Sequence, residues 1–292
     1  MNPLNRTRTS FATRLAAILA SAVFTGAVAL AQAPAAVSPG ELDKIVSRIA
    51  LYPDPLLAQI LGAATYPEDI PDAAQWADQH HYLAGDALAK AIADDHLPWD
   101  PSVQALLPFP SVLETMAGDM AWTDQLSNAV LAQRAEVMDA VQRMRKKARD
   151  FGYLRSSGQI VVGTGPYITI LPVNPEFICV PYYDPLIVFA AMRRGVSLGG
   201  SIIFGYGITI GAAFRPWGWG AIRFDWGAHS WFIGNTIWNR TWADRAGYKG
   251  PYGAQRFETG KRVEGHELIQ RSQHEREAGR AGHTRVEEHR GR

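Results

Sequence analysis

The sequence predicts an α+β protein, in which an N-terminal helical domain is followed by a small antiparallel β segment, a Gly/Trp-rich region and a disordered polar tail. Residues 41–152 carry apolar side chains at helical spacing, residues 153–192 carry β-branched runs between turn residues, and glycine and tryptophan dominate after residue 193. With 292 residues, 47% of them apolar, the chain is long enough to bury one or two cores. The predicted segments are 1–31, 32–40, 41–152, 153–192, 193–253 and 254–292.

The first 31 residues are predicted to be a signal peptide. Arg6, Arg8 and Arg14 precede an uncharged apolar stretch, and small residues follow it. We expect cleavage after Ala31, with an uncleaved N-terminal anchor as the alternative. The protein is therefore expected to be exported, periplasmic or outer-membrane-associated, and residues 32–40 are predicted to form a Pro/Ala linker.

The helical domain contains two Asp-Pro dipeptides, Asp54-Pro55 and Asp100-Pro101, at an offset of 46 residues within a weak internal repeat. Aspartate is favoured as an N-cap because its carboxylate accepts the free N–H groups of the first turn. Proline is favoured at the first helical position, where its missing N–H costs nothing. These dipeptides are predicted to start helices; catalytic carboxylates in a repeated loop are the alternative.

One long amphipathic helix is predicted from Asp124 to Asp150. Apolar residues recur there at spacings of three, four or seven, which places them on one face. Basic residues crowd the C-terminal end, where positive charge suits the helix dipole, although such a cluster could also bind an anion. Gly152 is expected to supply the left-handed cap.

The β segment is predicted to be a small meander of strands at 159–163, 167–172 and 177–181. Asp184-Pro185 follows the third strand and is expected to form a turn rather than a helix cap. Cys179, the single cysteine, permits neither an intramolecular disulfide nor a cysteine-based zinc site, and its apolar neighbours indicate a buried strand thiol.

The Gly/Trp-rich region begins with an uncharged run, residues 195–214. The run is long enough to cross a bilayer, but its many glycines also suit a hairpin packed on the protein. Six of the nine tryptophans follow within 26 residues and form a candidate interaction surface, although tryptophan also covers cores. They are Trp217, Trp219, Trp226, Trp231, Trp238 and Trp242. Residues 254–292 hold too few apolar side chains to fold.

Charge is distributed unevenly along the chain. The formal charge is +1, and removal of the three arginines of the predicted signal peptide leaves −2. Residues 54–124 carry twelve acids against one lysine, which argues against a nucleic-acid surface there. Residues 151–292 carry seventeen Lys or Arg against eleven acids, so the two parts could attract each other.

Four segments together resemble a known family. They are "IALYPDPLLAQILGAATYPEDI" (49–70), "WDPSVQALLPFPSVL" (99–113), "VMDAVQRMR" (137–145) and "NPEFICVPYYDP" (174–185). They are similar to the secreted bacterial family catalogued as domain of unknown function 3300. The resemblance implies a Gram-negative envelope protein, and it carries over no activity, cofactor or catalytic residue.

The favoured functional hypothesis is a non-enzymatic interaction or structural module of the envelope, without cofactor or metal, whose partner is an envelope protein or polymer. The first alternative is a membrane-associated assembly or anchor protein, with peripheral or inserted contact through residues 195–250. The second is a cell-wall or polysaccharide hydrolase, in which acid pairs such as Asp94/Asp95 or Asp54/Asp100 would perform glycoside chemistry.

Overall fold

The computed structural model describes residues 34–190 and 202–247, all within the compact unit Ala33–Arg292. The predicted signal peptide, the first part of the uncharged run and the predicted polar tail lie outside the described residues. The described part is helical up to residue 150 and continues with short antiparallel ladders, which confirms the predicted α+β fold class.

The helical region follows the prolines of the sequence. Its elements are α1 (Pro39–Val46), α2 (Asp54–Ala63), η1 (Pro67–Asp69), α3 (Ile70–Gln79), α4 (Gly85–Asp94), α5 (Pro101–Gln104), α6 (Pro110–Gly118), α7 (Met120–Ala132) and α8 (Arg134–Asp150). A proline occupies the first or second position of α1, α2, η1, α3, α5 and α6, where its missing N–H is tolerated. Helix α2 packs against α5, and α3 packs against α6.

The predicted long helix is two helices. The chain breaks at Gln133, whose φ of −139° and ψ of 47° are not helical. The side-chain amide of Gln133 accepts from Val37 N–H (2.6 Å) and donates to Val37 C=O (3.2 Å), which ties the break to the segment before α1. Helix α8 alone carries the amphipathic face that buries Val137, Val141 and Met144. The predicted cap is confirmed, since Gly152 has a φ of 80°.

The β segment is only partly a meander. Strands β1 (Ile160–Val162) and β2 (Ile170–Pro172) form the predicted hairpin. Strand β3 (Phe177–Ile178), however, pairs with β6 (Ile208–Thr209), and β4 (Pro181–Tyr183) pairs with β5 (Ile202–Phe204). The described part of the uncharged run therefore supplies partner strands, so the prediction that β2 pairs with β3 is wrong. No helix in the described part of the chain is long and apolar enough to cross a membrane.

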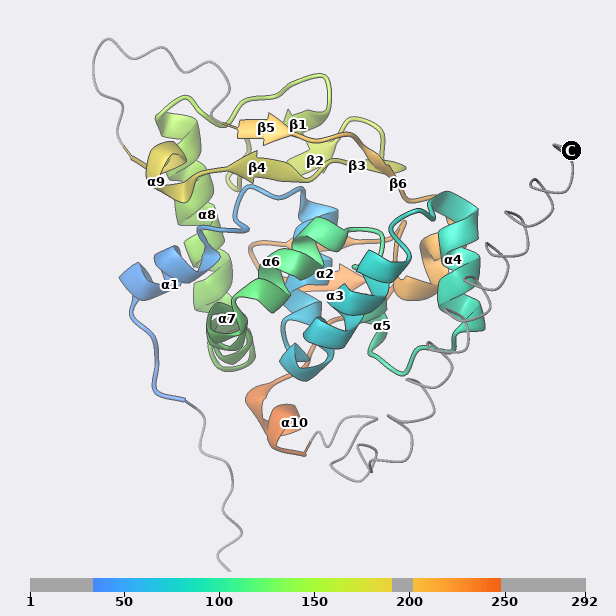
Figure 1. The fold of residues 1–292 in the computed structure, drawn as a ribbon. Coiled ribbons are helices and arrows are strands. Elements are labelled where there is room, and N and C mark those ends of the chain that lie inside the picture. Colours follow the sequence, from blue (N-terminus) through green and yellow to red (C-terminus); the bar gives the residue numbers. More distant parts are fainter. Residues whose placement is uncertain (1–33, 191–201, 248–292) are drawn as a thin grey trace, which may run out of the picture. The chain divides into compact units, whose positions relative to one another are not determined.

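The remaining elements are α9 (Pro185–Val188), η2 (Ala212–Trp217), β7 (Arg223–Asp225), β8 (Ser230–Ile233), β9 (Thr236–Ile237) and α10 (Trp242–Gly247). Strands β7, β8 and β9 form an antiparallel sheet in that order. The ladders that contain β1–β5 lie on one side of the helices, and α8 runs down from the left of these ladders toward α7 (Figure 1).

Two buried clusters hold these layers together. The larger one joins the helices to Ile178, Val180, Ile210 and Phe214 of the later region. The smaller one includes Leu51, Ala148, Leu154, Ile160 and Ile170, and it lies between α8 and the β1–β2 hairpin. The predicted helical domain and the Gly/Trp-rich region thus share one core, because apolar faces of both are buried against each other.

Candidate functional site

Asp54, the first Asp of the repeated dipeptide, is a buried ion-pair partner and not a helix cap. The N-cap position of α2 is taken by Pro53, and the Asp54 side chain makes no capping hydrogen bond. The residue is 4% exposed, and its Oδ1 lies 2.6 Å from Arg145 Nη1. The same oxygen accepts from the N–H of Ile170 (3.2 Å). The capping prediction for Asp54 is wrong because its carboxylate faces the interior.

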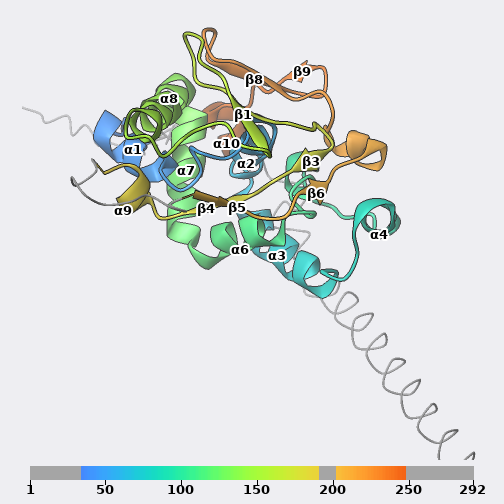
Figure 2. The same cartoon turned by 90° about the horizontal axis from the view of Figure 1, so that it is seen from above.

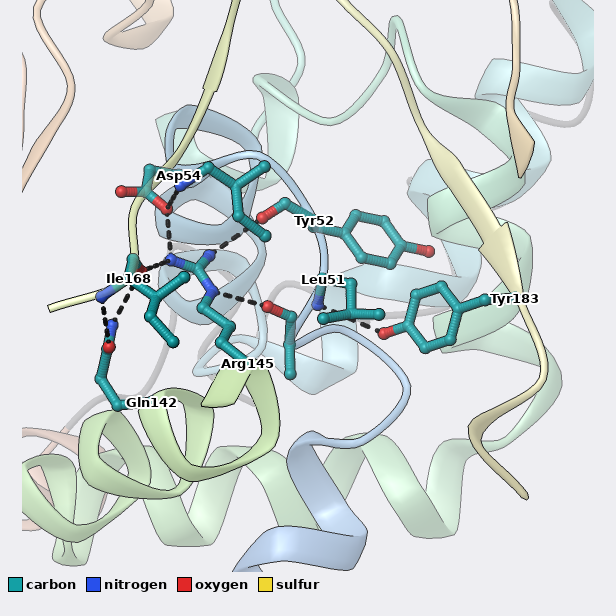
Figure 3. A network of polar contacts seen from close by, with 9 residues as sticks. Leu51, Tyr52, Asp54, Gln142, Arg145, Ile168 and Tyr183 are labelled. Carbon is teal, nitrogen blue, oxygen red and sulfur yellow. Dashed lines mark hydrogen bonds and ion pairs between the residues drawn. The ribbon is translucent and has the colours of Figure 1, made fainter. Parts of the chain in front are cut away.

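Arg145, in α8, is fully buried, and all three nitrogens of its guanidinium group donate hydrogen bonds. Besides Asp54, it donates to the carbonyls of Ala50 (Nε, 2.8 Å), Tyr52 (Nη2, 3.0 Å) and Ile168 (Nη1, 2.8 Å) (Figure 3). A buried charge is tolerated only when it is paired and hydrogen-bonded. This one side chain therefore joins α8 to the α1–α2 connection and to the loop before β2.

The loop between β1 and β2 is fixed by a second contact from α8. The Gln142 side-chain amide accepts from Ile168 N–H (2.8 Å) and donates to Ile168 C=O (3.1 Å). Gly163 N–H donates to Thr169 C=O (2.8 Å) across the base of the loop, and a Cβ at Gly163 would lie 2.2 Å from Thr169 Oγ1, so a larger residue there would displace the Thr169 side chain. The loop that carries Tyr167 is thus held by α8 and by the hydrogen bond at its own base.

Burial sets the protonation of the groups in this network. It raises the pKa of Asp54, against the opposing effects of Arg145 and of the hydrogen bonds to the carboxylate. Burial, with Tyr182 nearby, raises the pKa of Tyr52 to about 12. Burial also raises the pKa of Tyr183 well above its usual value, and its hydroxyl donates to Ser47 C=O (2.8 Å). Both phenols therefore stay neutral and serve as apolar packing and hydrogen-bonding groups.

A groove opens above this network. One hollow of about 540 Å³ is lined by the β1–β2 loop and the β7–β8 hairpin, and a second of about 440 Å³ is lined by the same loop and α8. Pro166 and Tyr167 line both, so the two hollows adjoin, and we call them together the Tyr167 groove. Figure 2 shows the yellow-green β1–β2 loop beside the orange β7–β8 segment. The wall contains Trp226, whose ring lies 5.0 Å from the Arg145 guanidinium.

The groove carries charged side chains at its surface. Arg223 and Asp225 lie on β7 and line the first hollow. The second hollow is lined by Asp139 together with three cations of α8, namely Arg143, Lys146 and Arg149. His229 Nε2 lies 2.9 Å from Asp139 Oδ1, and this contact ties the β7–β8 turn to α8. Asp225 and His229, four residues apart in the sequence, have separate partners, because Asp225 accepts from the N–H of Ala228 and His229 contacts Asp139.

The tryptophans mainly cover the core. Trp217, Trp219, Trp226 and Trp231 are buried, so the interpretation of these four as an exposed interaction surface is wrong. Trp238 is half-buried and stacks on Trp231 with ring centroids 4.7 Å apart.

Two of these rings reach across to the helices. The indole N–H of Trp217 donates to Gln104 Oε1 (2.7 Å), and that of Trp219 donates to Ala105 C=O (3.1 Å). Both acceptors lie at the end of α5, so the Gly/Trp-rich region is docked on the second repeat unit. Trp242 begins α10 with a partly exposed side chain.

The other Asp-Pro dipeptides cap helices. Asp100 Oδ1 accepts from Ser102 N–H (2.9 Å) and Pro101 begins α5, as the sequence predicts. Asp184 accepts from Leu186 N–H (2.8 Å) and Pro185 begins α9, so this dipeptide starts a short helix rather than the predicted turn. The difference arises because β4 ends directly before Asp184, which leaves the next N–H groups free for its carboxylate.

The acid pairs considered for glycoside chemistry have structural partners. Asp94 pairs with Lys90, and Asp95 accepts from the indole N–H of Trp76 (2.7 Å). Asp54 pairs with Arg145, whereas Asp100 caps α5. Over residues 34–190 and 202–247, no group of three or more His, Cys, Asp or Glu side chains is placed to hold a metal ion. Cys179 is buried, and its burial raises the pKa of the thiol.

Sequence reasoning missed Gln142, Tyr167 and Arg223. It counted Arg145 among the exposed basic residues at the C-terminal end of the long helix, which is wrong because Arg145 is fully buried. A signal for Arg145 was present: it lies four residues after Val141 and three before Ala148, within the apolar stripe of α8. A charged residue at such a position is buried and needs a partner. Tyr167 and Arg223 had no comparable signal, because the groove forms only when two segments distant in sequence meet.

The fold and the groove define a mainly helical α+β protein that carries short β-ladders and a surface groove beside a buried arginine–carboxylate pair. The chain belongs to the family described as "Protein of unknown function (DUF3300)", which matches residues 38–246. It is 31% identical over 223 residues to "Uncharacterized protein YacH" of Escherichia coli (strain K12), a match covering 61% of this chain and 36% of that protein. The chain therefore corresponds to about a third of the length of this relative. No solved structure matches the chain.

Proposed function

We propose that this chain is an exported, non-enzymatic interaction module of the cell envelope that binds its partner in the Tyr167 groove. The observation that carries the proposal is the support beneath the groove. Arg145 and Gln142 together fix the backbone of Ile168, next to Tyr167, through hydrogen bonds of 2.8 to 3.1 Å. A binding loop held in place before the ligand arrives loses less conformational entropy on binding.

The titratable groups beneath the groove favour binding over catalysis. The Asp54 carboxylate is occupied by Arg145 and by a backbone N–H, and the raised pKa values of Tyr52 and Tyr183 keep both phenols neutral. A general base needs a free acceptor within reach of a substrate proton. The groups that face the groove, Tyr167, Arg223 and Asp225, are instead suited to recognition.

Export and envelope location rest on the sequence of residues 1–31. A periplasmic extract of cells that produce the full chain should contain a product starting at Gln32. Retention of the full-length chain in the cytoplasm would contradict this part of the proposal.

Site-specific photo-crosslinking in intact cells tests the groove. A photoreactive phenylalanine derivative would replace Tyr167, and the matched control would replace Tyr82, an exposed aromatic outside the groove. We expect a discrete adduct with an envelope component from position 167 and none from position 82. Equal, diffuse labelling from both positions would reject the groove as the binding site.

A second candidate function, peripheral membrane association, is favoured by the outer face of the ladders. Strand residues alternate in direction, and Ile160, Ile170 and Ile178 point into the cores. The alternate positions are also apolar but exposed, which is unusual for a solvated antiparallel sheet. They are the cross-strand pairs Val161/Leu171 and Tyr182/Ile203, together with Phe177.

Tyr206 and Leu186, 99% and 85% exposed, are further exposed large apolar or aromatic side chains in the segments next to these strands. Tyrosine with aliphatic side chains is the composition of membrane–water interfaces, so the proposed occupant is a bilayer surface. Sedimentation with phospholipid vesicles tests it: Ile203→Asp and Leu186→Asp should release the protein, whereas Tyr82→Asp should not. Recovery of the unaltered protein in the supernatant would remove this candidate.

A further inference from the structure

Arg223 is the cation in the groove with the most available donors. In the described part of the chain its guanidinium lies 3.8 Å from the centroid of the Phe232 ring and forms no ion pair. The guanidinium thus lies over the Phe232 ring, and Arg223 also lines the first hollow, where none of its N–H groups has an acceptor in the described part of the chain. A planar fork held in this way matches the two oxygens of a carboxylate.

The far end of the groove also has an excess of positive charge. Asp43 is shared by Arg143 (2.8 Å) and Lys147 (3.1 Å), and Asp150 is shared by Lys146 and Arg149. With Asp139, which also lines the second hollow, four cations against three carboxylates leave a net charge of +1 on this end of α8. Three of these cations line the second hollow, so positive charge lies on both sides of Tyr167.

Asp225 restricts the kind of anion that fits. Its carboxylate lines the first hollow, and its Oδ1 accepts from the N–H of Ala228 (2.9 Å). An ionised carboxylate has capacity for several donors, so it favours a ligand with hydroxyl groups and repels one that offers only negative charge. Between the charged ends lies Tyr167, which is 40% exposed and lines both hollows, and whose aromatic ring is a flat apolar group.

We propose that the Tyr167 groove binds an acidic saccharide chain, and this inference rests on the groove being the binding site of the proposed function. A sugar ring stacks on Tyr167, a sugar hydroxyl donates to Asp225, and a sugar carboxylate accepts from Arg223. The next acidic sugar lies among the cations of α8. An acidic peptide offers Asp225 backbone N–H donors beside side chains of like charge, whereas each sugar ring offers several hydroxyl donors.

Titration calorimetry on the purified mature chain tests this assignment. The probes are an oligogalacturonate and a hyaluronan oligomer as acidic saccharides, a neutral galactose oligomer, and polyglutamate. We expect both acidic saccharides to bind more tightly than the other two, and more weakly as NaCl rises from 50 to 300 mM. Arg223→Gln should weaken binding about tenfold or more, since hydrogen bonds to charged groups are lost. Arg155→Gln, an exposed arginine outside the groove, is the matched control and should bind normally.

The outcomes separate this inference from the proposed function. Equal binding of the neutral oligomer, equal binding of polyglutamate, or unchanged affinity in Arg223→Gln would each overturn the acidic-saccharide assignment. So would the absence of binding by any saccharide. If a specific crosslink from position 167 persists in cells in any of these cases, the groove remains a binding site for another class of ligand. Acidic-saccharide binding without that crosslink would leave the chemistry of the groove intact and reject the proposed function.

Discussion

The two Asp-Pro dipeptides of the internal repeat share a sequence and differ in what the aspartate does. Each dipeptide starts a helix, with proline at an early position. The carboxylate of Asp54 turns inward to Arg145, whereas that of Asp100 stays at its own helix end and accepts from Ser102. The dipeptide therefore determines where a helix begins. Its surroundings determine the partner, because α2 is buried along its length and a carboxylate there needs a counter-charge.

Among the variants that test this difference, Asp54→Ala is expected to lose the most stability. Removal of the carboxylate leaves Arg145 buried with an unpaired charge, which typically costs about 3–5 kcal/mol. Urea unfolding followed by circular dichroism should show this loss. Asp100→Ala is the comparison, and equal losses in the two variants would mean that both carboxylates act as simple caps.

The Arg145→Lys variant tests whether the geometry of the guanidinium, and not only its positive charge, stabilises the buried pair. An ammonium group keeps the charge but cannot reach Asp54 and all three carbonyls that the guanidinium fork satisfies. We expect a loss of roughly 2–3 kcal/mol from the unpaired buried carbonyls. Hydrogen exchange should also speed up at the amides of Ile168 and Ile170. Unchanged exchange there would show that Arg145 does not hold the loop of the groove.

Helix starts were the most predictable feature, because proline and aspartate act through the backbone beside them. The cap at Gly152 and the β1–β2 hairpin arise from equally local chemistry. The pairing of β3 with β6 and of β4 with β5 could not be predicted, since strands of two or three residues carry too little pattern to specify a partner. The break at Gln133 depends on a contact with Val37, 96 residues away.

The candidate site was less predictable than the fold. Tryptophan is amphipathic, and composition alone does not say whether its ring faces solvent or core. Trp231 is buried because it stacks with Trp238 and lies beneath Arg134, at 5.5 Å from its guanidinium. The Tyr167 groove is formed by α8, the β1–β2 loop and the β7–β8 hairpin together, so no single stretch of sequence contains it.

A moderate loss of stability is expected for Asp100→Ala, which removes one helix cap. The variant loses the bonds from the N–H and hydroxyl of Ser102, and such caps contribute about 1 kcal/mol. Asp100→Asn keeps a capping oxygen and should recover most of the stability in the same urea titration. A loss of about 3 kcal/mol or more for Asp100→Ala, the size expected for a buried ion pair, would remove the contrast with Asp54.

A pH dependence is expected next to this cap, at Asp69. Burial, with the charges of Glu68, Asp100 and Asp72, raises the pKa of Asp69 to about 7. The folded state therefore holds this proton more tightly than the unfolded state, and the stability so gained is lost as pH rises from about 4 through 7.

Asp69→Asn should remove that decline. The free energy of unfolding of the variant, compared with that of the wild type, should therefore be higher at pH 8 than at pH 5. Parallel stability curves for the two proteins between pH 5 and 8 would contradict the raised pKa.

The smallest effect is expected for Asp184→Ala, at the third Asp-Pro dipeptide. Asp184 caps α9 with a bond of 2.8 Å, as Asp100 caps α5, and both helices have four residues. In α9 Leu186 and Ile187 are exposed and Val188 is buried, whereas Ser102 and Val103 of α5 are both buried. Asp184 also accepts one hydrogen bond where Asp100 accepts two, so the loss should be roughly 0.5 kcal/mol, the low end for a cap. A loss as large as that of Asp100→Ala would show that neither the second hydrogen bond of Asp100 nor the greater exposure of α9 changes the contribution of the cap.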